Sequence, residues 1–107
     1  VEAHVDEAVA TLKEDGLFVQ QTESPFYHQP LLQRLFSDIR SLFPITRTYL
    51  ASIPLYPGGL HCFTLGSKRY DPLQGEVPVL PFATRYYNRE IHRSCFALPT
   101  FIQDLLK

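Results

Sequence analysis

The sequence predicts a mixed α/β fold that forms part of an open sheet and ends in an antiparallel strand pair and short helices. A helical pattern in residues 1–13 is followed by a tight turn and a short apolar run, which is typical of one helix-to-strand step of such a sheet. Further along, two runs rich in β-branched and aromatic residues flank a short loop. That loop is too short for a parallel crossover, so it predicts antiparallel pairing.

The first helix is predicted over residues 1–13, and Asp15-Gly16 marks its end and the following turn. Its apolar residues recur at steps of three and four: Val5, Ala8, Val9 and Leu12. The run Leu17-Phe18-Val19 contains no polar residue, which predicts a strand buried on both faces. Residues 22–30 then form a polar loop at the carboxyl end of that strand, where open α/β sheets bind ligands.

The second helix, residues 30–43, has the clearest amphipathic pattern, and Pro44 ends it. We expect its apolar stripe to belong to the core: Leu31, Leu32, Leu35, Phe36, Ile39, Leu42 and Phe43. Strands are predicted over residues 46–53 and 60–66, and two prolines and two glycines give the loop between them an unusual, rigid backbone. An extended surface segment (70–82) and short helices near 88–95 and 99–106, the latter with Pro99 in its first turn, complete the chain.

Composition and charge exclude several classes of partner. The 107 residues suffice for one small domain, and the net charge of −1 comes with no basic stripe. We therefore expect neither nucleic acid nor a membrane as partner. The chain shows no signal peptide and no apolar run approaching the roughly 18 residues of a membrane span, so we expect a cytoplasmic protein.

The two cysteines, Cys62 and Cys95, are far apart and form no metal-binding pair. No ligand spacing relates them to the four histidines: His4, His28, His61 and His92. We expect no metal site, and we expect both thiols to be reduced and partly buried. The chain contains no methionine and starts at Val1, from which we expect a processed product or an excised piece of a longer chain.

Several stretches resemble the C-terminal part of bacterial spermidine synthases. The two most specific are Gln-Thr-Glu-Ser-Pro at 21–25 and Ile-Pro-Leu-Tyr-Pro-Gly-Gly-Leu at 53–60, and the stretch at 53–60 is similar to that family's Ile-Pro-Thr-Tyr-Pro-Ser/Gly-Gly loop. Residues 63–68, 84–88 and 96–101 are similar to the family's last strand, the stretch before its last helices and its closing Phe-x-Leu-Pro-x-Phe. The resemblance extends from Leu12 to nearly the end of the chain.

This resemblance implies a methyltransferase-like doubly wound sheet, of which residues 1–107 are the C-terminal part. The family transfers an aminopropyl group from decarboxylated S-adenosylmethionine to putrescine, which gives spermidine and methylthioadenosine. Its glycine-rich cosubstrate-binding turn, its Asp-rich catalytic loop and its N-terminal β domain lie upstream, and neither of the two motifs occurs in this chain. We therefore assign no catalytic residue, and we expect the isolated chain to be inactive and to bind no cofactor alone.

The resemblance also implies which residues contact the diamine. Such a site must anchor a flexible dication and hold one amine about 3–3.5 Å from the carbon that it attacks. The amide oxygen of Gln21 is expected to point into the diamine pocket, and the hydroxyl of Tyr56 to contact the diamine while its ring forms the wall. The alternatives are a polar residue that simply ends a strand and a tyrosine that packs the loop onto the core.

Glu23 and His61 are weaker candidates for the same pocket. Glu23 adds negative potential, or it is a solvated acid or a helix-capping partner. Many bacterial members of the family carry tryptophan where this chain has His61, so the histidine either alters the pocket wall or points away from it. Tyr27 and His28 are expected to be surface or interface residues.

Two other functions stay open. The His61 difference leaves a related aminopropyltransferase, such as a spermine-type enzyme, or a putrescine N-methyltransferase. A chain of this size is also compatible with a non-catalytic oligomerisation module. In either case, exposed sheet edge and apolar surface predict that the isolated chain forms homo-oligomers or exchanges strands.

Overall fold

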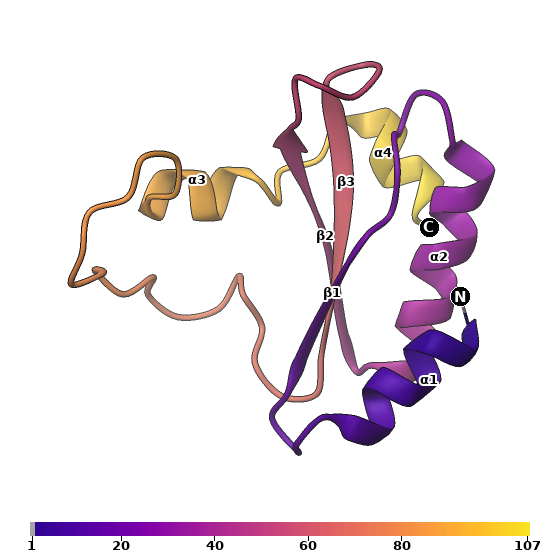
Figure 1. Cartoon of the computed structure of the whole chain (residues 1–107), viewed down its shortest axis with the longest axis horizontal. Helices are drawn as coiled ribbons and strands as arrows, with labels where there is room; N and C mark the ends of the chain where they lie inside the picture. The colour runs from indigo at the N-terminus through magenta and orange to yellow at the C-terminus, as the bar shows by residue number, and fades with distance from the viewer. Residues whose placement is uncertain (1) are drawn as a thin grey trace.

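The computed structural model describes residues 2–107, with side chains from residue 7 onward. The elements follow in the order α1 (Glu2–Thr11), β1 (Leu17–Gln21), α2 (Gln29–Leu42), β2 (Ile45–Ser52), β3 (Leu60–Ser67), α3 (Arg89–Ser94) and α4 (Thr100–Leu105). The three strands form an antiparallel sheet in the order β1-β3-β2 (Figure 1). The predicted elements are all present, and their ends differ from the prediction by a few residues.

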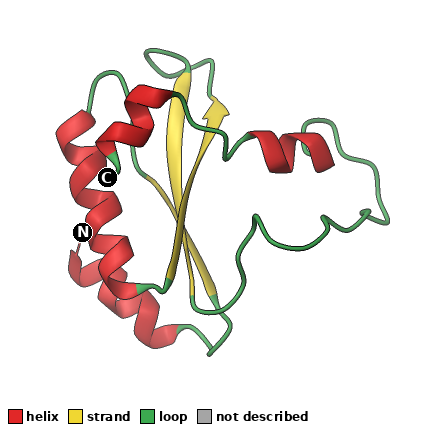
Figure 2. Cartoon of the chain, turned by 180° about the vertical axis from the view of Figure 1, so that it is seen from behind, coloured by secondary structure: helices red, strands yellow, loops and turns green. Residues whose placement is uncertain are grey.

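The helices are distributed unequally over the two faces of the sheet. Helices α1, α2 and α4 lie together on one side, whereas α3 and the long segment before it lie on the opposite side (Figures 1 and 2). On the α3 side, the ring of Tyr49 on β2 stacks on Phe63 of β3 at 5.3 Å and meets Phe96 edge-on at 5.5 Å. The backbone N–H of Leu50 also donates to the carbonyl of Cys95 at 2.9 Å, so the end of α3 is fixed to β2.

The core forms where the apolar stripe of α2 meets the sheet. Leu32, Leu35 and Ile39 are buried, as the helical spacing predicted, and Phe43 leaves the helix in an extended conformation with its ring also buried. Ile39 and Phe43 pack against partly buried residues of α1 and its following turn, β1 and the end of α2: Val9, Leu12, Phe18 and Leu42. Burial of such a stripe supplies most of the stability of a helix of this length.

A second cluster joins α4 to α2 and β3. Leu32, Cys62 and Ile102 are completely buried and contact one another across the three elements. Burial raises the pKa of the Cys62 thiol to about 12, because the thiolate would lose its hydration. Burial also raises the pKa of Cys95, and neither cysteine is in a disulfide. Pro99 is the residue before α4 rather than part of its first turn.

The face of the sheet under α2 carries two unusual packing features. The hydroxyl of Thr64 on β3 lies 2.9 Å from that of Thr22 and 3.3 Å from that of Thr48 on β2, so the three buried hydroxyls form one chain across the sheet. Near the other end of β3, the ring of Phe43 lies directly on Gly66, where a Cβ atom would be only 2.4 Å from Cδ2 of Phe43. The φ of Gly66 is not in the left-handed region, so the backbone conformation does not require glycine. Glycine is required because of the contact with the Phe43 ring.

The prediction that β1 is buried on both faces is wrong. Leu17 is 49% exposed and Val19 is 48% exposed, whereas Phe18 between them packs against Phe43. The reason is that β1 is an edge strand, and α1 and α2 cover only the face on which Phe18 lies. A continuous apolar run is typical of a strand covered on both sides, but within residues 7–107 only one side of β1 is covered.

Lys68, directly after β3, closes the end of α1. Its ammonium group donates to the backbone carbonyls of Val9 at 2.7 Å and Leu12 at 2.8 Å. The Val9 carbonyl belongs to the last turn of the helix and Leu12 directly follows the helix, where a cation is favoured by the helix dipole and by carbonyl groups that lack partners. A strand end that is distant in sequence therefore supplies the cap that the Asp15-Gly16 turn does not provide.

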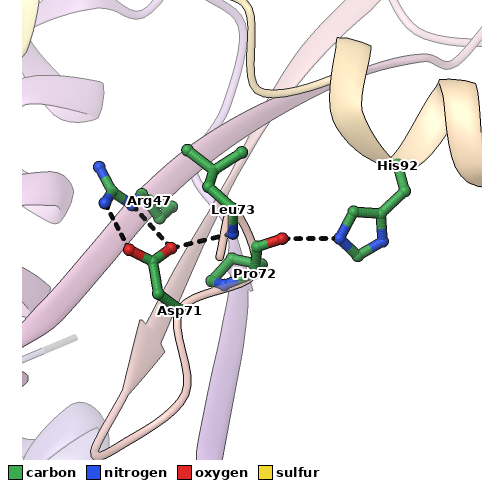
Figure 3. Close-up of polar contacts among 5 residues, drawn as sticks. All are labelled: Arg47, Asp71, Pro72, Leu73 and His92. Carbon is green, nitrogen blue, oxygen red and sulfur yellow. Dashed lines mark hydrogen bonds and ion pairs between the residues drawn. The ribbon is translucent and has the colours of Figure 1, made fainter. Parts of the chain in front are cut away.

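The irregular segment after β3 is held at both sides. Asp71 accepts two hydrogen bonds from Arg47 of β2, at 3.1 and 2.6 Å, and a third from the backbone N–H of Leu73 at 3.0 Å (Figure 3). The next residue, Pro72, accepts a hydrogen bond from Nε2 of His92 in α3 at 2.8 Å. The segment contains no helix or strand, as predicted, and these contacts join it to both β2 and α3. It is neither extended nor exposed throughout, because Gln74 donates to the carbonyl of Asp71 in a turn and Val77 is buried.

We predict that the fold loses a measurable part of its stability in acid because of Asp71. Its side chain is only 6% exposed, and the hydrogen bonds from Arg47 hold the pKa of its carboxyl below the usual value, against the opposing effect of burial. A lowered pKa stabilises the fold at pH values above about 4, and this contribution is lost as the pH falls through the lowered pKa. We expect Asp71→Asn to cost about 1–2 kcal/mol at neutral pH and to show a weaker acid dependence in urea unfolding.

The matched control for this prediction is Asp104→Asn. Asp104 pairs with Lys107 at 3.2 Å, but both side chains are exposed, so we expect almost no change in stability. An Asp71→Asn variant that followed the pH dependence of the unmodified chain would show that the partly buried ion pair between Arg47 and Asp71 does not contribute.

Candidate functional site

An open cavity of about 390 Å³ lies where the end of β1 meets the start of β3. Because the two strands are antiparallel, residues 20–23 of one lie beside residues 61–64 of the other. The cavity is lined by residues of both strand ends and of the two loops beside them: Gln21, Glu23, Ser24, Tyr27, His28, Tyr56, Pro57 and His61.

The first wall is the loop of residues 22–28, which extends the sheet and then turns sharply. Thr22 donates to the carbonyl of Cys62 at 2.9 Å, and Cys62 donates to the carbonyl of Glu23 at 3.0 Å, so the strand pairing continues past β1. Glu23 then adopts a positive φ of 79°, which is unusual for a residue with a Cβ atom. Backbone strain of this kind persists only where the surroundings enforce it, and it is concentrated at functional sites.

Ser24 stabilises the turn that follows. Its Oγ accepts hydrogen bonds from the backbone N–H groups of Phe26 at 3.1 Å and Tyr27 at 3.3 Å. Its carbonyl accepts another from the backbone N–H of His28 at 3.1 Å. This arrangement directs Tyr27 and His28 back over the cavity, just before α2 begins.

The second wall is the loop of residues 53–59, which is closed by three backbone hydrogen bonds. Ile53 donates to Gly59, Tyr56 donates to Ile53 and Gly59 donates to Tyr56, at 2.7 to 3.0 Å. Gly58 and Gly59 both have positive φ, as the sequence predicted. A Cβ atom on Gly58 would also lie 3.0 Å from Cε2 of Tyr27, so the glycine allows the two loops to touch.

A polar contact at the base of the cavity connects the strand ends. Nε2 of Gln21 lies 3.0 Å from Nδ1 of His61, and the His61 ring lies 4.7 Å from the ring of Tyr56, centroid to centroid. His61 is 6% exposed, whereas Tyr56 is 42% exposed. The site therefore offers a carboxamide, a phenol, an imidazole and the carboxylate of Glu23 around one open volume.

The structure brings together all four residues that the sequence singled out. Gln21, Tyr56, Glu23 and His61 line the same cavity, and of the two alternatives for His61 the ring lies in the wall. Tyr27 and His28 are exposed, as expected, but they also line the cavity, which the sequence interpretation missed. Ser24 and Pro57 were missed as well. The sequence signal for Tyr27 and His28 is the Ser24-Pro25 turn, which determines where residues 26–28 lie.

Neither a metal centre nor a membrane-spanning helix is found among the residues that the structure describes. In that part of the chain, no three His, Cys, Asp or Glu side chains are close enough together to hold a metal ion. Among the helices within residues 2–107, none has the length and apolar character needed to cross a bilayer.

Comparison with known proteins identifies the family. Residues 1–74 match the spermine/spermidine synthase domain. The chain belongs to the spermine/spermidine synthase family. A polyamine aminopropyltransferase of Caldicellulosiruptor bescii is 59% identical over 97 residues, and one of Shouchella clausii is 52% identical over the same length. The family resemblance inferred from the two loops is therefore confirmed.

Solved structures of the family confirm the predicted fold class. The spermidine synthase of Thermotoga maritima matches 99% of the chain with a TM-score of 0.92 and 36% sequence identity. A spermidine synthase in complex with the transition-state analogue AdoDATO matches with the same TM-score and identity. The three strands and their helices are thus arranged as in these methyltransferase-like enzymes.

The match covers only part of each relative. The aligned region is 90% of this chain but 35% of the two aminopropyltransferases, and it is 39% of the Thermotoga maritima chain. The residues present here therefore correspond to about one third of a spermine/spermidine synthase family protein.

Proposed function

We propose that this chain is the C-terminal part of the catalytic domain of a cytoplasmic spermidine synthase and forms one wall of its diamine pocket. The observation that carries the proposal is the convergence of Gln21, Glu23, Tyr56 and His61 on one cavity at the strand ends. The relatives named polyamine aminopropyltransferase and spermidine synthase support the reaction class. Putrescine is the proposed acceptor, and decarboxylated S-adenosylmethionine is the proposed cosubstrate of the whole enzyme.

The reaction defines what this wall must do. A neutral amine nitrogen forms a bond to the carbon next to the sulfonium, the carbon–sulfur bond breaks, methylthioadenosine leaves and the amine gives up a proton. The residues of this chain bind and orient the diamine, since carbonyl and hydroxyl oxygens accept hydrogen bonds from ammonium groups. Oε1 of Gln21 and the hydroxyl of Tyr56 are the proposed acceptors, and the carboxylate of Glu23 adds attraction for the second cationic end.

The loop geometry suits this positioning role. Tyr56 lies in a loop closed by three backbone hydrogen bonds and packed on Tyr27 through Gly58, so the backbone that carries its ring has little freedom to move. A fixed acceptor loses little entropy when the ligand binds, and it holds the attacking nitrogen in a narrow range of positions.

We predict that Tyr56→Phe in the full-length enzyme raises the putrescine KM about 3- to 10-fold or lowers kcat by a similar factor, because one hydrogen bond to the diamine is lost. Initial rates at varied putrescine and saturating cosubstrate measure the effect. Tyr70→Phe is the matched control, because Tyr70 is 53% exposed and lies outside the cavity. Unchanged kinetics for Tyr56→Phe would remove the hydroxyl from the site.

The His61 difference supports a second candidate function. A histidine in place of the larger indole ring changes the wall of the cavity, which leaves room for a related aminopropyltransferase with another acceptor or for a putrescine N-methyltransferase. Competition between putrescine and spermidine in the full-length enzyme tests the acceptor. A preference for spermidine, or transfer of a methyl group, would contradict the proposed reaction.

We also propose that the chain forms homo-oligomers. One edge of β1 has no partner strand within residues 2–107, and its Leu17 and Val19 side chains are about half exposed. An unpaired edge with apolar side chains favours pairing with a second copy. Sedimentation of the isolated chain should give a dimer or larger species, and a well-behaved monomer would contradict this. A stable oligomer that binds no polyamine would instead favour a non-catalytic module.

A further inference from the structure

His61 lies between two of the proposed diamine-binding groups. It is the second residue of β3, it is 6% exposed, and its ring is within contact distance of the Gln21 carboxamide on one side and the Tyr56 ring on the other. A side chain that can change its charge is therefore in direct contact with a side chain proposed to bind the ligand.

The contact with Gln21 determines which nitrogen of His61 carries the proton. Nε2 of a glutamine bears two hydrogens and can only donate, so Nδ1 of His61, at 3.0 Å, must accept. The proton of the neutral ring is then on Nε2 of His61, which is buried and has no hydrogen-bond partner within the described residues. The Gln21 carboxamide and the His61 tautomer are thus fixed together, because a change in one requires a change in the other.

The same contact determines the orientation of Gln21. With its Nε2 held by His61, the carbonyl oxygen Oε1 is the end of the carboxamide left for the cavity. We propose that His61 is a positioning residue that keeps this oxygen directed to an ammonium group of the diamine, an inference that rests on the proposed function. Without the contact, the carboxamide is free to present its NH₂ group, which cannot accept a hydrogen bond from an ammonium group.

Protonation of His61 reverses this arrangement. Because Nε2 already carries a proton, the second proton binds Nδ1, which then becomes a donor that faces the donor group of Gln21. The hydrogen bond survives only if the carboxamide rotates by half a turn, which places Oε1 on His61 and NH₂ toward the cavity. The charged ring also repels a cationic ligand. Protonation of His61 is therefore expected to weaken diamine binding.

Other groups that face the cavity must be separated from His61. Tyr27, His28 and Glu23 line it from the loop after β1, and Tyr56 lines it from the loop before β3. Glu23 and His28 can also change their charge, so they are the competing explanations for a loss of binding in acid. His28→Asn should keep that loss, because the rotation of Gln21 depends on His61. Glu23→Gln should keep it too, on top of its own weaker binding.

The tautomer can be tested on the chain itself. Long-range ¹H–¹⁵N spectra of the ¹⁵N-labelled chain at neutral pH should show His61 with a proton on Nε2 and an unprotonated Nδ1. The opposite tautomer would place a donor next to Nε2 of Gln21 and would overturn the proposal.

Two substitutions of His61 test its effect on binding in the full-length enzyme. His61→Phe keeps a ring beside Tyr56 but removes the acceptor, so the putrescine KM at neutral pH should rise roughly 2- to 10-fold with a smaller change in kcat. His61→Asn can offer Oδ1 in place of Nδ1, so its KM should stay within about twofold of the unmodified enzyme. Both variants should show a smaller acid-side increase in KM than the unmodified enzyme, because only the contribution of His61 is removed.

The possible outcomes distinguish this inference from the proposed function. His61→Phe with the KM and pH profile of the unmodified enzyme would overturn the positioning role, whereas absence of aminopropyl transfer in every variant, including the unmodified enzyme, would reject the proposed function. His61→Phe removes a buried N–H that lacks a partner within the described residues, but it also leaves the part-buried donor of Gln21 without its acceptor, so the two effects oppose each other and the melting temperature should change little. A higher KM that came with a lower melting temperature would indicate a packing defect and would contradict the proposal.

Discussion

Replacing Gly66 with alanine is expected to destabilise the fold by about 1–3 kcal/mol, measured as the free energy of unfolding in urea. The added Cβ atom would lie 2.4 Å from Cδ2 and 2.7 Å from Cγ of Phe43, which is much closer than van der Waals contact. Phe43 is 4% exposed, and its ring packs against Ile39 and stacks on Phe18 at 6.0 Å. The ring cannot move without disturbing the cluster that joins α1, α2 and β1.

A double-mutant cycle gives the control for Gly66. In a Phe43→Leu background the ring is absent, so Gly66→Ala should cost much less than in the unmodified chain. Gly59→Ala is a second comparison, because no atom lies within 4 Å of the added Cβ and only the positive φ of 71° opposes it. Equal costs for Gly66→Ala in both backgrounds would show that the contact with Phe43 is not the reason for the glycine.

Replacing Thr64 with valine is expected to cost about 1–3 kcal/mol, because it leaves two buried hydroxyl groups without their partner. Thr64 is fully buried and lies at the centre of the hydroxyl chain, between Thr22 at 2.9 Å and Thr48 at 3.3 Å. Thr22 directly follows Gln21 and begins the loop that forms the first wall of the cavity. The variant should therefore also increase hydrogen exchange in residues 22–28.

Thr48→Val is the matched control for Thr64→Val. It changes the same chemical group at the end of the chain, where only the longer contact is lost and Thr64 keeps its bond to Thr22. We expect a clearly smaller loss of stability. Equal losses for the two variants would mean that the hydroxyl groups do not act as a connected chain.

The sequence predicted most elements of the fold because their patterns are local. The stripe of α2 repeats at helical spacing, and the short loop before Leu60 admits only antiparallel pairing, so neither depends on distant residues. The exposure of Leu17 and Val19 was predicted wrongly because it does depend on distant residues. Burial depends on what covers a strand, and an apolar run contains no information about which faces of the sheet have helices.

The candidate site was predicted in part. Gln21 and Tyr56 were found through two loop motifs, and their convergence follows from the antiparallel pairing of β1 with β3. Tyr27 and His28 were missed as cavity residues because their position depends on the positive φ of Glu23 and on the turn at Ser24. Such backbone geometry has no periodicity that a sequence pattern can reveal.

The order in which the cavity assembles during folding follows from its connectivity. Tyr56 and His61 are neighbours within one hairpin, whereas Gln21 and His61 are 40 residues apart. Closing the longer loop costs about 2 kcal/mol more in chain entropy, so the hairpin forms its half of the site first. The hydrogen bond from Gln21 to His61 is then among the last contacts to form and the first to be lost when the chain is destabilised. The cavity is therefore expected to be a sensitive reporter of the integrity of the whole sheet.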